Sequence, residues 1–142
     1  MARKLSQQER EALLADVHVG VISVALPVPD RSPLAVPIWF SFDPAEGVSV
    51  LTERTSRKAR AIEQAGRFTL VVQQEAVPYR YVSVDGPVVA ARPIEDGELE
   101  RIARRYLGTR MGIAYATGFG SGAPVYRYTM APQRWYTYTG AD

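Results

Sequence analysis

The residues best suited to chemistry lie where a predicted strand meets a predicted helix. Residues 48–52 alternate in the way that is typical of a half-buried strand. Thr55 or Ser56 can cap the helix that follows, because a side-chain hydroxyl accepts an amide hydrogen of the first turn. Arg57 and Lys58 lie in that turn, where free amides and the positive end of the helix dipole attract an anion. The junction predicts a phosphate site; the alternative is a solvated helix start that carries two basic residues.

Other kinds of chemistry find little support in the residue types. The chain has no cysteine, which excludes disulfides, thiolate zinc sites and cysteine nucleophiles. His18 is the single histidine, so neither a histidine-rich metal site nor a Ser-His-Asp triad is expected. Asp85, Glu95 and Asp96 are candidate acids, but nothing in the sequence pairs them. No residue is therefore assigned as catalytic, and no metal is expected.

Length and charge restrict the class of protein. The 142 residues suffice for one domain with a real core, and 46% hydrophobic and 23% charged residues are ordinary for a globular chain. A net charge of +2 does not indicate a nucleic-acid binder. No apolar run approaches the roughly 20 residues that span a membrane, and the N-terminus lacks the apolar core of a signal peptide. We expect one cytoplasmic domain, residues 1–142, with neither nucleic acid nor membrane as a partner.

Strand patterns dominate the chain. β-branched and aromatic residues recur in short runs bounded by turn residues, which indicates strands joined by tight connections. Pro37 cannot donate to a ladder, so it marks an edge strand or a bulge. The pattern predicts a mainly β fold with peripheral helices and a six- to seven-stranded antiparallel sheet closed into a barrel. The expected strands are 19–26, 34–42, 48–52, 68–74, 79–86 (continuing to 91 past a kink at Gly86-Pro87), 125–130 and 134–138.

Three helices are expected around this sheet. A capping box, Ser6 with Glu9 three residues later, starts a short N-terminal helix. The helix that begins at the anion site should end at Gly66, because glycine favours the left-handed position that follows a helix. An apolar stripe predicts the third helix over 94–107.

The third helix is basic, and the segment that follows it is rich in glycine. Arg101, Arg104 and Arg105 lie off the apolar stripe; such residues most often form a solvated face, and contact with a partner or cofactor is the alternative. Gly108 should end the helix. Segment 109–123 holds four of the eleven glycines and lacks the lysine of a P-loop. We expect a mobile loop there, and it is a candidate lid.

Aromatic residues are concentrated in the predicted strands. There are eight tyrosines, four phenylalanines and two tryptophans, and a barrel core with amphipathic rims explains most of them. An anion site beside aromatic strands also suits a flat, phosphorylated ligand such as a flavin-type cofactor. In such proteins the cofactor supplies the chemistry and the protein supplies position and electrostatics, so a shortage of acid–base residues is expected.

Several segments in order, residues 36–40, 51–52 with 55–62, 67–72 and 79–88, together carry a family resemblance. The sequence resembles the pyridoxamine 5′-phosphate oxidase-like, split β-barrel flavin and deazaflavin oxidoreductases. The Ser-Arg-Lys-Ala helix start after a strand is the most specific element. The match runs from about residue 17 to 91 and more weakly through Trp135.

The resemblance implies a six-stranded split barrel and a homodimer with two cofactor sites at its interface. It implies that Arg57 and Lys58 bind the cofactor phosphate, with Ser56 and Thr52 assisting. Backbone groups of the strand at 37–40 would line the flavin ring. The cofactor-binding residues expected in this way are Pro37, Ile38, Trp39, Phe40, Leu51, Thr52, Ser56, Arg57, Lys58 and Tyr81.

The sequence departs from the pattern of the oxidase branch at two places, and these departures bear on which activity is expected. Tyr81 stands near the position where the oxidase branch commonly has glutamine. The oxidase's late Arg-x-His is absent after Trp135, so pyridoxamine phosphate oxidation itself is not expected. The segment from Pro78 to Val88 is similar to the actinobacterial branch that uses the deazaflavin coenzyme F420.

We therefore expect an oxidoreductase that uses reduced F420 for hydride transfer to a small unsaturated or aromatic substrate. The first alternative is an FMN-binding oxidase or reductase of the same fold. The second is a non-catalytic protein that stores or carries a cofactor or haem. The third is a structural barrel without a ligand.

Overall fold

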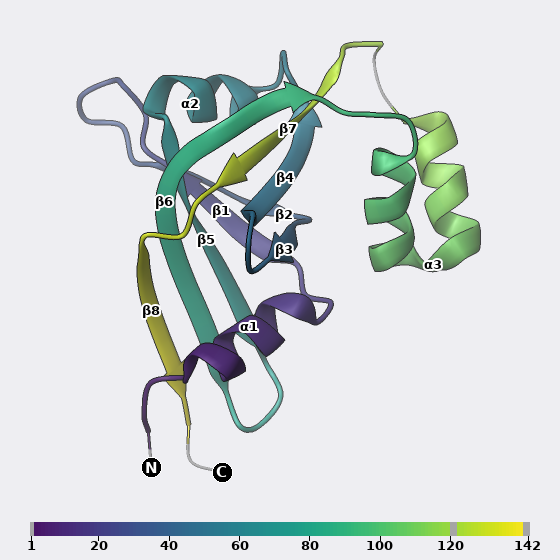
Figure 1. The fold of residues 1–142 in the computed structure, drawn as a ribbon. Helices are drawn as coiled ribbons and strands as arrows, with labels where there is room; N and C mark the ends of the chain where they lie inside the picture. Colours follow the sequence, from purple (N-terminus) through teal and green to yellow (C-terminus); the bar gives the residue numbers. More distant parts are fainter. Residues whose placement is uncertain (1, 120–121, 141–142) are drawn as a thin grey trace.

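The computed structural model describes residues 2–119 and 122–140, which form one antiparallel sheet with helices at its periphery (Figure 1). No helix in these ranges is long and apolar enough to cross a membrane. In chain order the elements are α1 (Gln7–Ala15), β1 (Gly20–Val24), β2 (Leu34–Ile38), β3 (Ser41–Asp43), β4 (Gly47–Glu53), α2 (Arg57–Ala65), β5 (Arg67–Gln74), β6 (Arg80–Pro93), α3 (Glu98–Gly118), β7 (Val125–Met130) and β8 (Arg134–Thr139).

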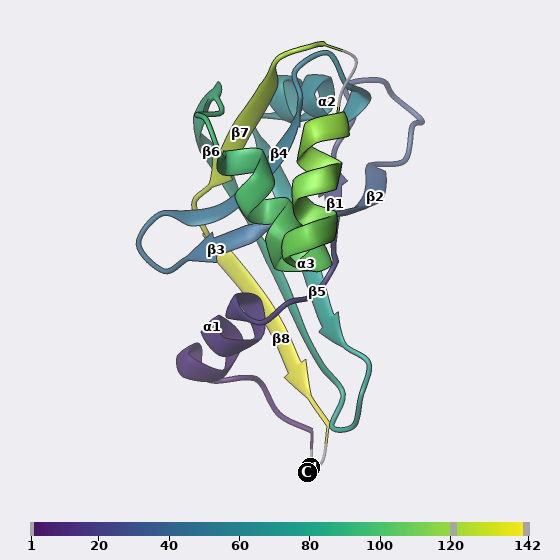
Figure 2. The same ribbon diagram turned by 90° about the vertical axis from the view of Figure 1, so that its right-hand side faces the viewer.

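The long strand β6 organises the sheet. Its first half pairs with β5 on one side and β8 on the other. Its second half pairs with β7 after an irregularity between Val88 and Ala90, and this replaces the kink predicted at Gly86-Pro87. The strand order is β2-β1-β5-β6-β7-β4-β3, with β8 beside β6, and the sheet curls into a half barrel (Figures 1 and 2). The predicted antiparallel, mainly β fold is confirmed.

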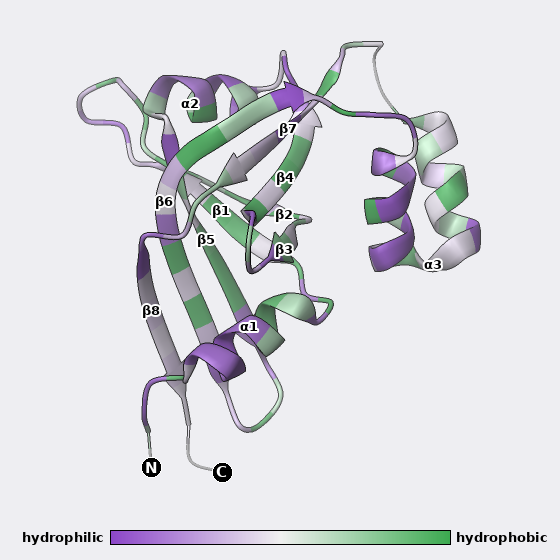
Figure 3. Ribbon diagram, viewed as in Figure 1, coloured by the Kyte–Doolittle hydropathy of each residue, from purple (hydrophilic) through white to green (hydrophobic). Residues whose placement is uncertain are grey.

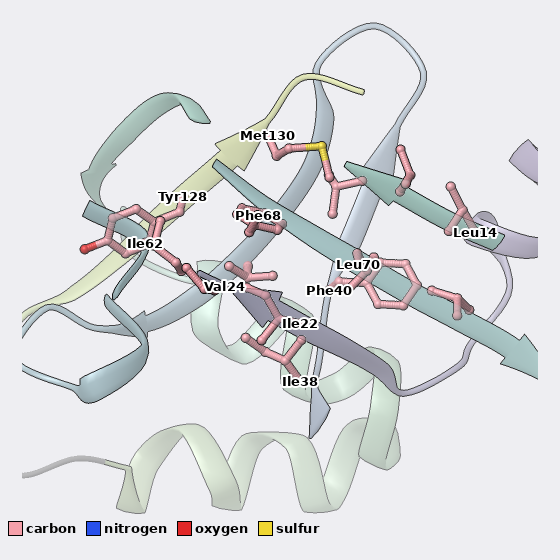
Figure 4. Close-up of a cluster of buried hydrophobic side chains, with 14 of the residues drawn as sticks. Leu14, Ile22, Val24, Ile38, Phe40, Ile62, Phe68, Leu70, Tyr128 and Met130 are labelled. Atoms are coloured by element: carbon pink, nitrogen blue, oxygen red, sulfur yellow. The ribbon is translucent and has the colours of Figure 1, made fainter. Parts of the chain in front are cut away.

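The core fills the inside of the curled sheet. Hydrophobic and hydrophilic residues alternate along β5 and β6 (Figure 3), so one face of each strand is apolar. Figure 4 shows the buried cluster, with Leu14 of α1 at one end and Ile62 of α2 beside Tyr128 at the other. Burial of apolar surface contributes about 25 cal/mol per Å². The two short helices α1 and α2 therefore stabilise the fold by covering part of the apolar core.

The predicted local signals at the helix ends are confirmed. Ser6 and Glu9 form the complete capping box of α1. Ser56 is the N-cap of α2, and Gly66 ends that helix with a φ of 70°, in the left-handed region. Pro37 lies in β2, the edge strand of the sheet, where its missing amide costs no ladder bond.

The strand predicted over 34–42 is interrupted. It forms two strands, β2 and β3, which pair with β1 and β4 respectively. Between them the amide and carbonyl of Phe40 contact the hydroxyl of Tyr106 rather than a neighbouring strand, at 3.1 and 3.2 Å. A side chain 66 residues away thus takes the place of a ladder partner at this point.

The prediction of a loop over residues 109–123 is wrong. Residues up to Gly118 form the second half of α3, whose two halves lie side by side in Figure 2. Gly108 ends the first half as predicted, with φ 82° and ψ 173°, and the chain resumes a helix immediately. The first half begins at Glu98 rather than at Ile94. Gly120 and Ser121, which belonged to the same prediction, lie outside the described residues.

Candidate cofactor site

The start of α2 has the geometry of an anion site. The Ser56 hydroxyl accepts the Ala59 amide at 3.1 Å and lies 2.9 Å from the Thr52 hydroxyl, so the end of β4 is tied to the helix cap. By helix geometry the amides of Arg57 and Lys58 have no carbonyl partner within α2. No acidic residue lies in this first turn to compensate the helix dipole.

A cavity of about 380 Å³ opens beside this helix start. It lies between the β2 end, β4, the first turn of α2 and both halves of α3, so residues far apart in sequence share its wall. The volume lies within the range of about 300–1,000 Å³ that is typical of small-molecule sites. Seven of the ten residues expected to bind a cofactor line it: Pro37, Ile38, Trp39, Leu51, Thr52, Ser56 and Lys58.

The basic charge of the cavity comes from Lys58. Its side chain is half-buried and lines the wall, and within the described part of the chain it forms no ion pair. Glu53 lines the same cavity and adds a negative charge to the wall near the end of β4. Arg57 is exposed on the same turn and is not part of the lining. The anion site therefore combines Lys58, two hydroxyls and the free amides.

Aromatic rings form the opposite wall. Trp39 and Tyr115 line the cavity with their ring centroids 5.1 Å apart, and Phe119 follows at 5.5 Å from Tyr115. Trp39 also stacks on Tyr106, with centroids 5.0 Å apart and planes at 4°. The three lining rings are tilted, with interplanar angles of 50° for Trp39 and Tyr115 and 38° for Tyr115 and Phe119, and they offer apolar ring faces and edges to a ligand. The cavity lining thus combines polar side chains, Lys58 among them, with three aromatic rings.

The hydroxyl of Tyr106 fixes this wall to the sheet. It donates to the His18 carbonyl at 2.8 Å and accepts the Phe40 amide at 3.1 Å. Burial raises the pKa of the Tyr106 phenol above its ordinary value of 10.0, so the group is neutral at physiological pH and able to donate. Arg105, the preceding residue, donates to the carbonyls of Ala15 and Asp16 at 3.0 and 2.8 Å. Together these bonds hold α3 against the rest of the molecule.

Three of the expected residues do not line the cavity. Phe40 has a completely buried side chain in the hydrophobic core. Arg57 is exposed, as described above. Tyr81 lies on β6, where its ring stacks on Tyr138 at 5.5 Å in a separate hollow of about 390 Å³.

Half of the lining was not expected from the sequence. Tyr115 and Phe119 belong to the segment predicted as a loop, although Met111, Tyr115 and Phe119 recur at intervals of four residues, a helical spacing that could have revealed it. No local signal distinguished the others. The unexpected lining residues are Val19, Glu53, Leu99, Ile102, Tyr115, Phe119 and Val125.

The titratable side chains that line the cavity are Glu53, Lys58 and Tyr115. Among the described residues no group of three His, Cys, Asp or Glu side chains could hold a metal ion. The cavity lining offers one lysine, one glutamate, the hydroxyls of Thr52, Ser56 and Tyr115, and three aromatic rings. Such a set can bind and orient a flat anionic ligand, and it fits a phosphorylated cofactor that brings its own chemistry.

No family model matches the chain, and no curated protein matches it. Solved structures do match. An F420 reductase is 22% identical, with 89% of this chain and 94% of that chain covered and a TM-score of 0.68. A FAD-binding protein from Mesorhizobium loti is 16% identical over 99% of both chains, with a TM-score of 0.65. A protein from Listeria innocua proposed as a pyridoxamine 5′-phosphate oxidase is 16% identical, covering 92% and 95%, with a TM-score of 0.64.

These likenesses show that the chain has the split-barrel fold of the pyridoxamine 5′-phosphate oxidase-like proteins. The resemblance noted in the sequence is confirmed at the level of the fold. A heme storage protein from Vibrio cholerae has the same fold. The fold alone is therefore compatible with several ligands, and the choice among them depends on the residues of the cavity.

Proposed function

We propose that this protein is an oxidoreductase that binds reduced coenzyme F420 and directs hydride transfer to a small unsaturated or aromatic substrate. The observation that carries the proposal is the cavity beside α2, where Ser56 and Lys58 of the helix start line the same space as Trp39 and Tyr115. Reduced F420 supplies a hydride when bound, and a solvent proton completes the reduction of the substrate.

The roles of the protein residues follow from their positions. Lys58, with the hydroxyls of Ser56 and Thr52, would hold the cofactor phosphate at the helix start. The β2 end from Pro37 to Trp39, with Leu51 opposite, would hold the ring system by backbone groups and apolar contact. Such positioning brings reactants together without a side-chain acid or base. Arg57 would add positive charge near the phosphate from the exposed side of the turn.

An FMN-dependent oxidase or reductase is the second candidate, since FMN also combines a phosphate with a flat ring system. The FAD-binding protein of the same fold supports a flavin in this kind of barrel. The preference for F420 rests on the sequence segment from Pro78 to Val88 and on the structural likeness to an F420 reductase.

The decisive experiment is a paired titration of the purified protein with F420 and with FMN, followed by ligand fluorescence. We expect F420 to bind more tightly than FMN. Lys58→Ala should weaken F420 binding by about tenfold to a hundredfold, because it removes a charge-assisted hydrogen bond. Arg60→Ala is the matched control: Arg60 is an exposed cation of the same helix that does not line the cavity, and its loss should leave affinity nearly unchanged.

The outcomes separate the alternatives. Tighter binding of FMN would replace F420 by FMN in the proposal. Absence of binding of both cofactors at micromolar concentration would overturn it. Binding of reduced F420 with no oxidation of the cofactor in the presence of unsaturated and aromatic substrates would indicate a carrier rather than an enzyme.

A further inference from the structure

A second hollow, of about 320 Å³, adjoins the cofactor cavity. Leu51 of β4 and Ile102 of α3 line both spaces, so the two spaces meet at these apolar side chains. A ligand in the second hollow would therefore contact the same apolar residues as a cofactor in the first. The two spaces together suit two molecules that react with each other.

The charge of the second hollow is its distinctive property. Arg101 and Arg105 of α3 and Arg127 of β7 all line it. The sequence placed Arg101 and Arg105 off the apolar stripe of their helix, where a solvated face is the usual outcome. The structure instead brings both to a hollow that also receives an arginine from the sheet.

The positive charge of these arginines is poorly compensated within the described chain. The side chain of Arg101 is exposed and makes no hydrogen bond or ion pair with any described residue. Arg105 donates only to uncharged carbonyls of α1 and its C-cap, and its Nε is buried without a partner there. Arg127 has its Nη2 3.8 Å from an Oε2 of Glu46, whose side chain is 68% exposed, so the pair is weak.

One carboxylate, Glu98, lines the same hollow and is already paired. It is 7% exposed, and its Oε1 accepts a hydrogen bond from Arg92 Nη2 at 2.6 Å. This pairing leaves the charge of the three lining arginines in excess. Glu98 Oε2 is buried with no partner among the described residues, so it can accept a hydrogen bond from a ligand.

We propose that this hollow anchors the carboxylate of the substrate. The guanidinium group presents paired donors that match the two oxygens of a carboxylate. The proposal rests on the proposed function and narrows it: the substrate is a small carboxylic acid whose unsaturated or aromatic part extends past Leu51 and Ile102 toward the cofactor. The free Glu98 Oε2 favours an acid that carries a hydroxyl or amide N–H near its carboxylate.

The test measures binding to the cofactor-free protein by calorimetry, with a panel of small unsaturated and aromatic acids and the neutral amide of each. We expect at least one acid to bind about tenfold or more tightly than its amide. Arg101→Gln and Arg127→Gln should each reduce that preference severalfold. Arg104→Gln is the control, because Arg104 is a cation of the same helix that does not line the hollow.

Three results would overturn the inference. One is a panel in which no acid is preferred over its amide. Another is a preference that survives both arginine variants. The third is a loss of F420 affinity in Arg101→Gln with unchanged binding of acids, which would assign the hollow to carboxylates of the cofactor itself. Because the acids are tested without cofactor, their binding stands or falls separately from the F420 titration.

Discussion

The Tyr106 hydroxyl is a single group on which several parts of the candidate site depend. It contacts the backbone of Phe40 at the break between β2 and β3 and the carbonyl of His18 before β1. Its ring supports Trp39, which lines the cofactor cavity. One hydroxyl therefore satisfies the backbone of the interrupted strand and also holds the aromatic wall in place.

Tyr106→Phe should lower the free energy of unfolding by about 1–3 kcal/mol, because it leaves buried backbone groups without a partner. Urea denaturation measures the change. The pKa of Tyr106 is higher in the folded protein than in the unfolded chain. The contribution of its hydroxyl to the free energy of unfolding is therefore fully present below pH 10.0 and is lost as the pH rises through the pKa of the folded protein. The difference between the two proteins should therefore shrink in alkaline solution. Tyr79→Phe, at a residue 58% exposed, is the control and should change little; an equal loss in both variants would contradict the assigned role.

Among the elements, α3 has the greatest influence on the site, since its first half lines both hollows and its second half lines the cofactor cavity. Leu99 and Ile102 come from the first half, and Tyr115 comes from the second. Gly108 separates the halves with a backbone conformation that only glycine adopts without strain. The turn at Gly108 is thus what returns Tyr115 to the cavity.

Gly108→Ala should destabilise the protein by about 1–3 kcal/mol through backbone strain. A Cβ at this position would meet nothing within 4 Å, so the cost comes from the backbone and not from a collision. Thermal unfolding measures it, and F420 affinity should fall as well because Tyr115 would shift. Gly118→Ala is the matched control: it also has open space, lies at the helix end and lacks a positive φ, so stability should stay the same or rise slightly. Equal unfolding temperatures for Gly108→Ala and the unmodified protein would refute the prediction.

At the scale of the whole molecule, the outer face of the sheet exposes several large apolar and aromatic side chains. Val21, Tyr81, Tyr136 and Tyr138 are exposed by 39%, 42%, 60% and 37%, and cross-strand pairing places them on one side of β1, β6 and β8. The family resemblance implies a homodimer, and we propose that a second copy of the chain covers this face. Tyr81, which lies outside the cavity of its own chain, would then belong to the dimer interface.

Light scattering should give a mass of twice 15.7 kDa for the purified protein. Tyr136→Glu should shift the mass toward the monomer, because it buries a charge in the proposed interface. Val28→Glu alters a residue of similar exposure, 54%, on the loop between β1 and β2, and should leave the dimer intact. A monomeric unmodified protein at micromolar concentration would exclude the proposed dimer.

Local chemistry determined much of this protein before any tertiary contact was known. The alternation of residues in β5 and β6, the caps at Ser6, Ser56 and Gly66, and the edge position of Pro37 each depend on a few neighbouring residues, so the sequence alone predicts them. The same is true of the capped helix start of α2 that we propose as an anion site, because its amides, cap and cations lie within one turn.

Only the tertiary structure decided which distant groups meet. The break at Phe40 depends on Tyr106, the aromatic wall depends on a helix that resumes after Gly108, and the basic hollow depends on Arg127 of β7 facing Arg101 of α3. Periodicity and capping act over a few residues, whereas these contacts join segments far apart in the chain. Their geometry follows from how the curled sheet and α3 pack together, and for this reason the capped start of α2 was predictable while the cavity beside it was not.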